Sequence, residues 1–357
     1  MTGKRLPIID LAKLNNPDTR QELLEELRDA LFKIGFLYLV NHGMETEAEQ
    51  IMAIAPKAFE VPMEEKEKVA MVTNSHFVGY TKLGAEFTAK KSDLREQYDF
   101  GSATSIDPKS PEIIPGNPAW RKIQGPTPYL PDSVLSGFES TVKSYINGMD
   151  KLTTSLLELI SESLNLPSDS LQPFVGEMNR LKIVKYPGTD DPQQSQGVGP
   201  HKDSSGMLTF VLQDDVGGLE VLDSDGEWIA ATPIPGSFVV NIAQGFEALT
   251  GGRCCATTHR VQSPPAGVTR YSIPYFHSVR LSLTLKEIED QLKFIQGKIP
   301  EPADDKRRKV ATFSEFLDPK YSCFGEAHLR NRILSHRDVA DRWYSDVKDQ
   351  YLKEIES

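Results

Sequence analysis

The sequence predicts an α+β fold in which a core of short β-strands lies between helical regions at both ends of the chain. From about residue 179 to 277, runs rich in β-branched and aromatic residues alternate with turns that contain Gly, Asp and Pro. Many short strands with close turns are typical of a β-sandwich or β-barrel. On both sides, apolar residues recur at helical spacing. The predicted strands are 181–186, 207–212, 218–222, 228–231, 237–242, 258–261 and 269–276.

The region before this core is predicted to contain short strands and two helices. Asn16 followed by Pro17 is a typical helix start, since Asn caps the free backbone N–H groups and Pro fits the first helical turn. Gly35 is a typical helix end. The predicted elements are a strand over 7–10, a helix that begins near Pro17 and ends at Gly35, a strand over 36–40, a turn over 41–43 and a helix over 45–59.

The rest of the chain is predicted to be an irregular loop and further helices. Seven prolines between residues 108 and 131 exclude regular structure there. A long helix with one buried face is predicted over 133–164, and a last helix over 338–355. We expect one compact unit with four parts: an N-terminal region (1–130), a core-packing helix region (131–178), the β core (179–285) and C-terminal helices (286–357).

The composition excludes several classes of partner. The chain has 357 residues and a net charge of −11, which argues against nucleic acid and against anionic membrane surfaces. The start of the chain lacks the apolar core of a signal peptide, and no apolar run approaches transmembrane length. Three cysteines, two of them adjacent, make a poor disulfide framework, so we expect ordinary thiols and a cytoplasmic location. Oligomeric state cannot be predicted from the sequence.

The triplet His201-Lys202-Asp203, with His259 further along, is the strongest chemical signal. On a strand, residues two apart point to the same face, so His201 and Asp203 are expected to lie side by side. Two histidines and one carboxylate that leave open coordination positions suit non-haem Fe(II) and oxygen chemistry. The glycines at 197 and 199 let the backbone approach closely, and the run that follows the triplet predicts a rigid strand. Taken alone, His259 would be interpreted as a core histidine.

Arg270 and Ser272, again two residues apart on a predicted strand, could bind a carboxylate beside this metal. A buried arginine needs an anion, because an unpaired buried charge is costly. If the strand is exposed, Arg270 is instead a surface ion-pair partner. Tyr186 could add a hydrogen bond, although an amphipathic core tyrosine is an equal interpretation. The five other histidines are expected to have no metal role: His42 in its turn, and His76, His277, His328 and His336.

With these residues in place, the chain resembles the Fe(II)- and 2-oxoglutarate-dependent dioxygenases of the isopenicillin N synthase-like group over nearly its whole length. Each motif alone is weak, but together they are specific. In the N-terminal half the resemblance is carried by 6–10, 35–43 and 93–100, and in the C-terminal half by His201-x-Asp203, 213–219, 249–253, 257–261 and Arg270-x-Ser272.

The resemblance implies a double-stranded β-helix, or jelly roll, with helices packed outside it. It implies that His201, Asp203 and His259 ligate Fe(II), and that Arg270 and Ser272, helped by Tyr186, hold the distal carboxylate of 2-oxoglutarate. O2 is then the second co-substrate, and succinate and CO2 are released. The resemblance further implies oxidation of a C–H bond of a small molecule by hydroxylation, desaturation or cyclisation, in specialised metabolite biosynthesis. We expect the substrate pocket to be lined by residues 75–100, Met207–Phe210, Phe276 and the C-terminal helices.

Two alternatives to this function remain open on the sequence. An oxidase like isopenicillin N synthase would use the same iron ligands but no 2-oxoglutarate, with the Arg-x-Ser pair holding a substrate carboxylate. A non-catalytic β-barrel would bind a small molecule without iron. A nucleic-acid demethylase on the same fold is disfavoured by the acidic charge.

The chain departs from the family pattern at two places. The segment between His201 and Gln213 is one residue longer than usual, and we expect a β-bulge at 204–206 to absorb the extra residue. The family usually has Gly-Asp after a strand that ends in an Asn-Ile type of sequence, whereas this chain has Asn241-Ile-Ala-Gln244. We therefore expect an altered turn there and no loss of iron binding.

Overall fold

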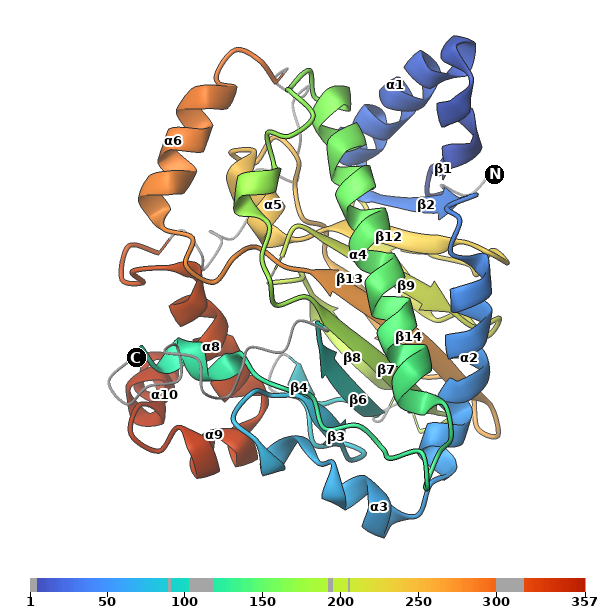
Figure 1. The fold of residues 1–357 in the computed structure, drawn as a ribbon, viewed down its shortest axis with the longest axis vertical. Coiled ribbons are helices and arrows are strands. Elements are labelled where there is room, and N and C mark those ends of the chain that lie inside the picture. The colour runs from blue at the N-terminus through green and yellow to red at the C-terminus, as the bar shows by residue number, and fades with distance from the viewer. Residues whose placement is uncertain are drawn as a thin grey trace.

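Two β-sheets pack face to face in the computed structural model, which describes residues 5–88, 91–102, 118–191, 195–204, 206–299 and 318–356 (Figure 1). Within this part of the chain, one sheet has eight strands in the order β1-β2-β12-β9-β14-β7-β6-β3 and the other has four in the order β11-β10-β13-β8. All pairs in these sheets are antiparallel except β1 with β2. The fold is the α+β jelly roll that the sequence and the resemblance predicted.

The strands of the large sheet are Ile8–Asp10 (β1), Phe36–Val40 (β2), Gly79–Thr81 (β3), Glu96–Gly101 (β6), Arg180–Pro187 (β7), Leu208–Gln213 (β9), Phe238–Ile242 (β12) and Thr269–His277 (β14). The strands of the small sheet are Gln196–His201 (β8), Leu219–Leu222 (β10), Trp228–Ala230 (β11) and His259–Gln262 (β13). Phe87–Thr88 (β4) and Lys91–Ser92 (β5) form a separate hairpin. The large sheet contains strands from both sides of the boundary predicted at residue 130, since four of its strands come from the N-terminal region.

Helices cover the outer face of the large sheet (Figure 1). Among the described residues, the helices that do so are Pro17–Lys33 (α1), Glu45–Glu60 (α2) and Phe138–Ser163 (α4). The Asn16 side chain caps α1 as predicted, by accepting from the Asp18 N–H. The predicted start of α4 at 133 was wrong, since residues 131–135 form a turn and the left-handed Gly137 (φ 76°) separates that turn from the helix. The other helices are Met63–Lys68 (α3), Gln244–Leu249 (α5), Leu285–Ile295 (α6), Phe324–Ser335 (α8), Arg337–Trp343 (α9) and Lys348–Glu356 (α10).

The predicted last helix over 338–355 is two helices, α9 and α10, because the buried Tyr344 turns inward between them and donates to the Ser75 carbonyl at 2.7 Å. The proline-rich loop lies partly outside the described residues, and its described part contains a 3₁₀ turn at Ala119–Ile123. Among the described residues, no helix is both long enough and apolar enough to cross a bilayer.

The packing of α4 predicts a large effect on stability. Leu157 has an exposed fraction of 0% and lies in the cluster between the helices and the large sheet. We expect Leu157→Ala to lower the free energy of unfolding by about 2–5 kcal/mol, because it leaves a cavity in a close-packed core. The exposed neighbour Glu158 gives the matched control, and Glu158→Ala should change it by less than about 0.5 kcal/mol. Urea unfolding measures both, and equal midpoints would contradict the described packing.

Candidate functional site

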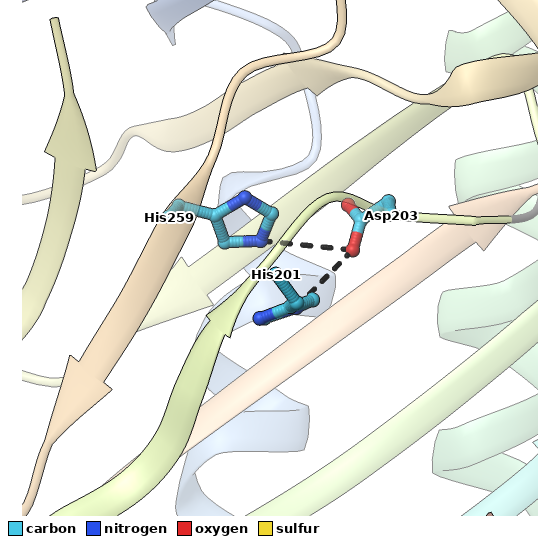
Figure 2. Close-up of side chains that lie close together, drawn as sticks. All are labelled: His201, Asp203 and His259. Atoms are coloured by element: carbon cyan, nitrogen blue, oxygen red, sulfur yellow. Dashed lines mark ion pairs between the residues drawn. The ribbon is translucent and has the colours of Figure 1, made fainter. Parts of the chain in front are cut away.

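Three side chains converge at one end of the small sheet. His201 ends β8 and His259 begins β13, and the two are direct partners in the antiparallel register. Their ring centroids lie 4.3 Å apart, and the Nε2 atom of each lies 3.6 Å from Oδ1 of Asp203 (Figure 2). One ligand atom from each of the three residues lies within 4.8 Å of the others. The predicted trio is therefore brought together, in a geometry that could hold one metal ion.

Asp203 does not reach this position from a strand, which corrects the geometric argument made from the sequence. It lies in the connection between β8 and β9, where its backbone carbonyl accepts from the Gln244 N–H at 3.0 Å. Ser204 and Gly206 also lie outside the strands, and the predicted β-bulge at 204–206 stays a prediction. Ser205 itself is outside the described residues.

Hydrogen bonds on the far side of each side chain orient the three ligand atoms. The Nδ1 atoms of His201 and His259 lie 2.9 and 3.1 Å from the carbonyl oxygens of Gly199 and Thr257. Because a carbonyl only accepts, each Nδ1 carries the proton and each Nε2 presents its lone pair. Oδ2 of Asp203 accepts from the Thr209 hydroxyl at 2.6 Å and from the Asn241 amide at 2.7 Å. Oδ1 is left facing the two imidazoles.

The ionisation states of the trio suit a metal ion. Burial alone would raise the pKa of Asp203, but the adjacent His259 and His201 and the hydrogen bond from Asn241 hold this pKa well below its usual value. Burial, followed by the nearby His201, lowers the pKa of His259 to about 4. An ionised carboxylate and a neutral imidazole are the forms that bind metals. Two nitrogens and one oxygen on one side of a cavity fit Fe(II) with open positions.

Sequence reasoning missed Thr209 and Asn241 as supporting residues. They are direct partners across β9 and β12, and both are buried polar residues flanked by apolar residues. A lone polar residue in an apolar strand was the available signal, but its partner Asp203 depends on long-range pairing. The altered turn expected after Asn241 is the helix α5, which begins at Gln244.

The Asn241 contact predicts an effect on metal affinity. Asn241→Ala removes one of two donors to Asp203, and we expect roughly 10- to 100-fold weaker Fe(II) binding, the range found for outer partners of metal ligands. Asn179→Ala is the matched control, since this buried asparagine instead donates to Asp150 at 2.7 Å. Anaerobic Fe(II) titration measures both variants. Wild-type affinity in Asn241→Ala would show that this hydrogen bond does not orient the carboxylate.

Arg270 forms the second part of the site. Its side chain is 1% exposed, and its Nε and Nη1 atoms are buried without a hydrogen-bond partner. Nη2 donates to Oε1 of Gln213 at 3.2 Å, a contact not foreseen from the sequence. Tyr186 lies opposite Arg270 in the β7–β14 register, and its ring is 4.9 Å from the guanidinium carbon. A buried guanidinium with unpaired donors indicates an anion-binding position.

The trio and Arg270 line the same cavity, of about 1460 Å³. Ser272 and Phe276 alternate with Arg270 along β14 and also line it, so the predicted shared face is confirmed. Of the predicted walls, the 75–100 region contributes Glu86–Thr88 and Arg95, and helix α8 closes one side. From the run 207–210, Thr209 is the residue that lines the cavity.

The five other histidines lie outside this trio. His42 supports its turn, since its Nδ1 accepts from the Met44 N–H at 3.0 Å. His277 is buried on the opposite side of β14 from Phe276. In the part of the chain that the structure describes, the His201, Asp203 and His259 trio is the group with metal-ligand geometry.

Comparison with known proteins decides the family. Residues 6–127 match the model of the N-terminal region of the non-haem dioxygenase in morphine synthesis, and residues 177–279 match that of the 2OG-Fe(II) oxygenase superfamily. The 2-oxoglutarate-dependent dioxygenase frbJ of Dothideomycetidae sp. (strain 11243) is 36% identical to this chain, and the alignment covers 98% of this chain and 94% of the relative. The chain belongs to the Fe(II)- and 2-oxoglutarate-dependent oxygenases. A second relative, a 2-oxoglutarate-dependent dioxygenase of Gibberella zeae, is 30% identical over 96% of this chain and 92% of its own length.

Solved structures of similar proteins agree with the assignment of this chain to the oxygenase family. A full-length Neurospora crassa protein in complex with α-ketoglutarate and thymine has a TM-score of 0.65 and 26% identity, covering 79% of this chain and 88% of that one. A putative 2OG-Fe(II) oxygenase of Caulobacter crescentus has a TM-score of 0.66 and 26% identity, covering 79% and 89%. The oxygenase is thus an enzyme that uses Fe(II), 2-oxoglutarate and O2. These findings favour it over the oxidase that needs no 2-oxoglutarate and over a non-catalytic barrel.

Proposed function

We propose that His201, Asp203 and His259 ligate the iron of this oxygenase, and that Arg270, Ser272 and Tyr186 hold the distal carboxylate of 2-oxoglutarate. The observation that carries this proposal is the presence, in one cavity, of three converging ligand atoms and a buried guanidinium with two unpaired donors. Two donors of one planar guanidinium match a carboxylate. The Tyr186 ring under the guanidinium keeps its orientation, and the Ser272 hydroxyl can add a further donor.

Each of these residues has a defined task. When bound, iron and 2-oxoglutarate supply the oxidising power, and succinate and CO2 are the products of the co-substrate. The carbonyls of Gly199 and Thr257 hold the two imidazoles in one tautomer. Thr209 and Asn241 restrain the carboxylate of Asp203 so that a single oxygen faces the metal. Arg270 orients the co-substrate, and α8 limits access of water to the cavity.

The substrate of this reaction is a small molecule, oxidised at a C–H bond in specialised metabolite biosynthesis. A cavity of about 1460 Å³ suits such a guest together with 2-oxoglutarate. The Neurospora crassa structure with thymine is an example of a related protein with a small molecule. The net charge of −11 disfavours nucleic acid and anionic membranes, and the cysteine content favours the cytoplasm.

Succinate formation tests the proposed function. Purified protein with Fe(II), 2-oxoglutarate and O2 should release succinate slowly by itself and faster with a metabolite extract that contains the substrate. Omission of 2-oxoglutarate or of iron should stop the release. Oxygen uptake with the extract but without succinate would support the oxidase instead.

A further inference from the structure

One face of helix α8 lines the active-site cavity with polar side chains. Positions 328, 331, 332 and 335 recur at helical steps of three and four, and all four line the cavity. The opposite face of the helix, with Leu329 and Ile333, is fully buried in the core. In Figure 1, α8 lies with α9 and α10 at the end of the molecule where β3 and β4 are found. A polar helix face that lines a cavity offers contacts to a guest.

Arg332 is a charged residue of α8 that lines the cavity, as Arg330 also does, and it attracts Glu86 without a direct ion pair. Among the described residues it forms no ion pair, and the hydrogen bond that it makes runs from its Nε to Nε2 of His328 at 3.5 Å. The terminal NH₂ groups of its guanidinium are therefore available to a guest. The side chain is half-buried, so an anion bound there would be partly shielded from water.

His328 lies beside Arg332 on this face and presents Nε2 to it. Its side chain is buried, and its Nδ1 has no hydrogen-bond partner. Burial, together with Arg332 and Arg180, holds the pKa of His328 well below its usual value, so the ring is neutral. A neutral imidazole that accepts at Nε2 carries its proton on Nδ1. Because Nε2 faces Arg332, Nδ1–H lies on the other side of the ring, and the Arg332 guanidinium is the donor that this pair offers to a guest.

The acidic residues nearby are already paired. Glu86 also lines the cavity, but its Oε2 lies 3.1 Å from both Arg95 and Lys182. Lys182 also lies 3.6 Å from Asp99. Arg332 contributes less to the charge compensation of Glu86 than Arg95, Lys182 and His336 do. The buried Arg180 adds further positive charge, and desolvation followed by the proximity of Arg332 lowers its pKa to about 9. This part of an otherwise acidic protein has an excess of positive charge.

We propose that Arg332 binds a carboxylate of the substrate. The inference rests on the proposed function, because it assumes that the iron site faces the same cavity, and it adds the chemical class of the substrate. A carboxylate is a planar group whose two oxygens match two donors of one guanidinium. Arg270 is not available for this task when 2-oxoglutarate occupies it.

Calorimetric titration with simple carboxylates tests this inference. The full-length protein, loaded with Fe(II) and saturated with 2-oxoglutarate under nitrogen, is titrated with benzoate, phenylacetate and 4-phenylbutyrate, and with the primary amide of each. We expect at least one acid to bind more tightly than its amide. Arg332→Gln should weaken that binding by roughly 10- to 100-fold, as for loss of a charge-assisted hydrogen bond, and Arg332→Lys should restore part of it. Amide binding should not change.

Arg337 provides the matched control. It lines the same cavity, is exposed and forms no ion pair among the described residues, so Arg337→Gln should leave carboxylate binding nearly unchanged. No preference for acids in the wild type, or an equal loss in Arg337→Gln and Arg332→Gln, would overturn the inference. Succinate formation in the absence of the probes is measured on the same preparations. A protein that still forms succinate but does not prefer acids disproves the carboxylate site alone, whereas absence of succinate disproves the proposed function.

Discussion

His201→Ala and Asp203→Ala variants should lose Fe(II) binding and 2-oxoglutarate-dependent succinate formation together. Outer partners of metal ligands typically contribute 10- to 100-fold to affinity or activity. A direct ligand must contribute more, so we expect both quantities to fall by more than about 100-fold. Removing Asp203 also leaves two neutral imidazoles, which compensate none of the charge of Fe(II). Anaerobic iron titration and a succinate assay measure the two quantities independently.

Lys202→Ala is the control, because Lys202 lies between the two ligands in sequence but is 3.8 Å from Glu247 in the structure. This variant should bind iron as the wild type does. Thermal unfolding of all three variants excludes loss of fold as the cause. Wild-type iron affinity in His201→Ala would remove His201 from the ligand set.

Arg270→Leu should raise the KM for 2-oxoglutarate by about 100-fold or more, because loss of one partner of a buried ion pair costs about 3–5 kcal/mol. The fold should not suffer, since two guanidinium nitrogens are buried without partners in the protein alone. Arg270→Lys should give an intermediate KM, because lysine keeps the charge but loses the planar geometry. Steady-state kinetics with varied 2-oxoglutarate, together with urea unfolding, separate binding from stability.

Arg260→Gln is the matched control for Arg270. Arg260 lies on β13 but pairs with Glu220 at 2.7 Å, and its guanidinium carbon is 4.0 Å from the Trp228 ring centroid. Its loss should leave the KM for 2-oxoglutarate near the wild-type value. If instead Arg270→Leu lowered stability and left this KM unchanged, Arg270 would be a structural residue.

Much of the fold could be predicted from local sequence signals. The strand β14 and the helix α1 follow from apolar periodicity and capping residues, which are local properties. The strand β8 was not predicted, because Gly197, Gly199 and Pro200 give it low strand propensity. It forms because it pairs with β13. The register of this pairing joins residues that are far apart in sequence, so no local sequence pattern predicts it. β6 was missed for a related reason, since its charged residues are buried through pairing with distant lysines.

In the candidate site, too, local signals predicted the residue types, whereas long-range pairing determines their arrangement. The residue types of the trio and of Arg270 could be found from spacing and from the family resemblance. The direct pairing of His201 with His259, and the loop position of Asp203, depend on how β8, β9 and β13 meet in space. Asn241 and Gln213 act on residues far from them in sequence, and Thr209 acts on Asp203 across the connection between β8 and β9, so their roles became visible when the register was known.

The most direct test of the central claim is an anaerobic crystal structure with Fe(II) and 2-oxoglutarate. We predict one iron bonded to Nε2 of His201, Nε2 of His259 and Oδ1 of Asp203, with the distal carboxylate of 2-oxoglutarate on the guanidinium of Arg270. Iron bound elsewhere, or the two imidazoles turned away from a common atom, would contradict the account.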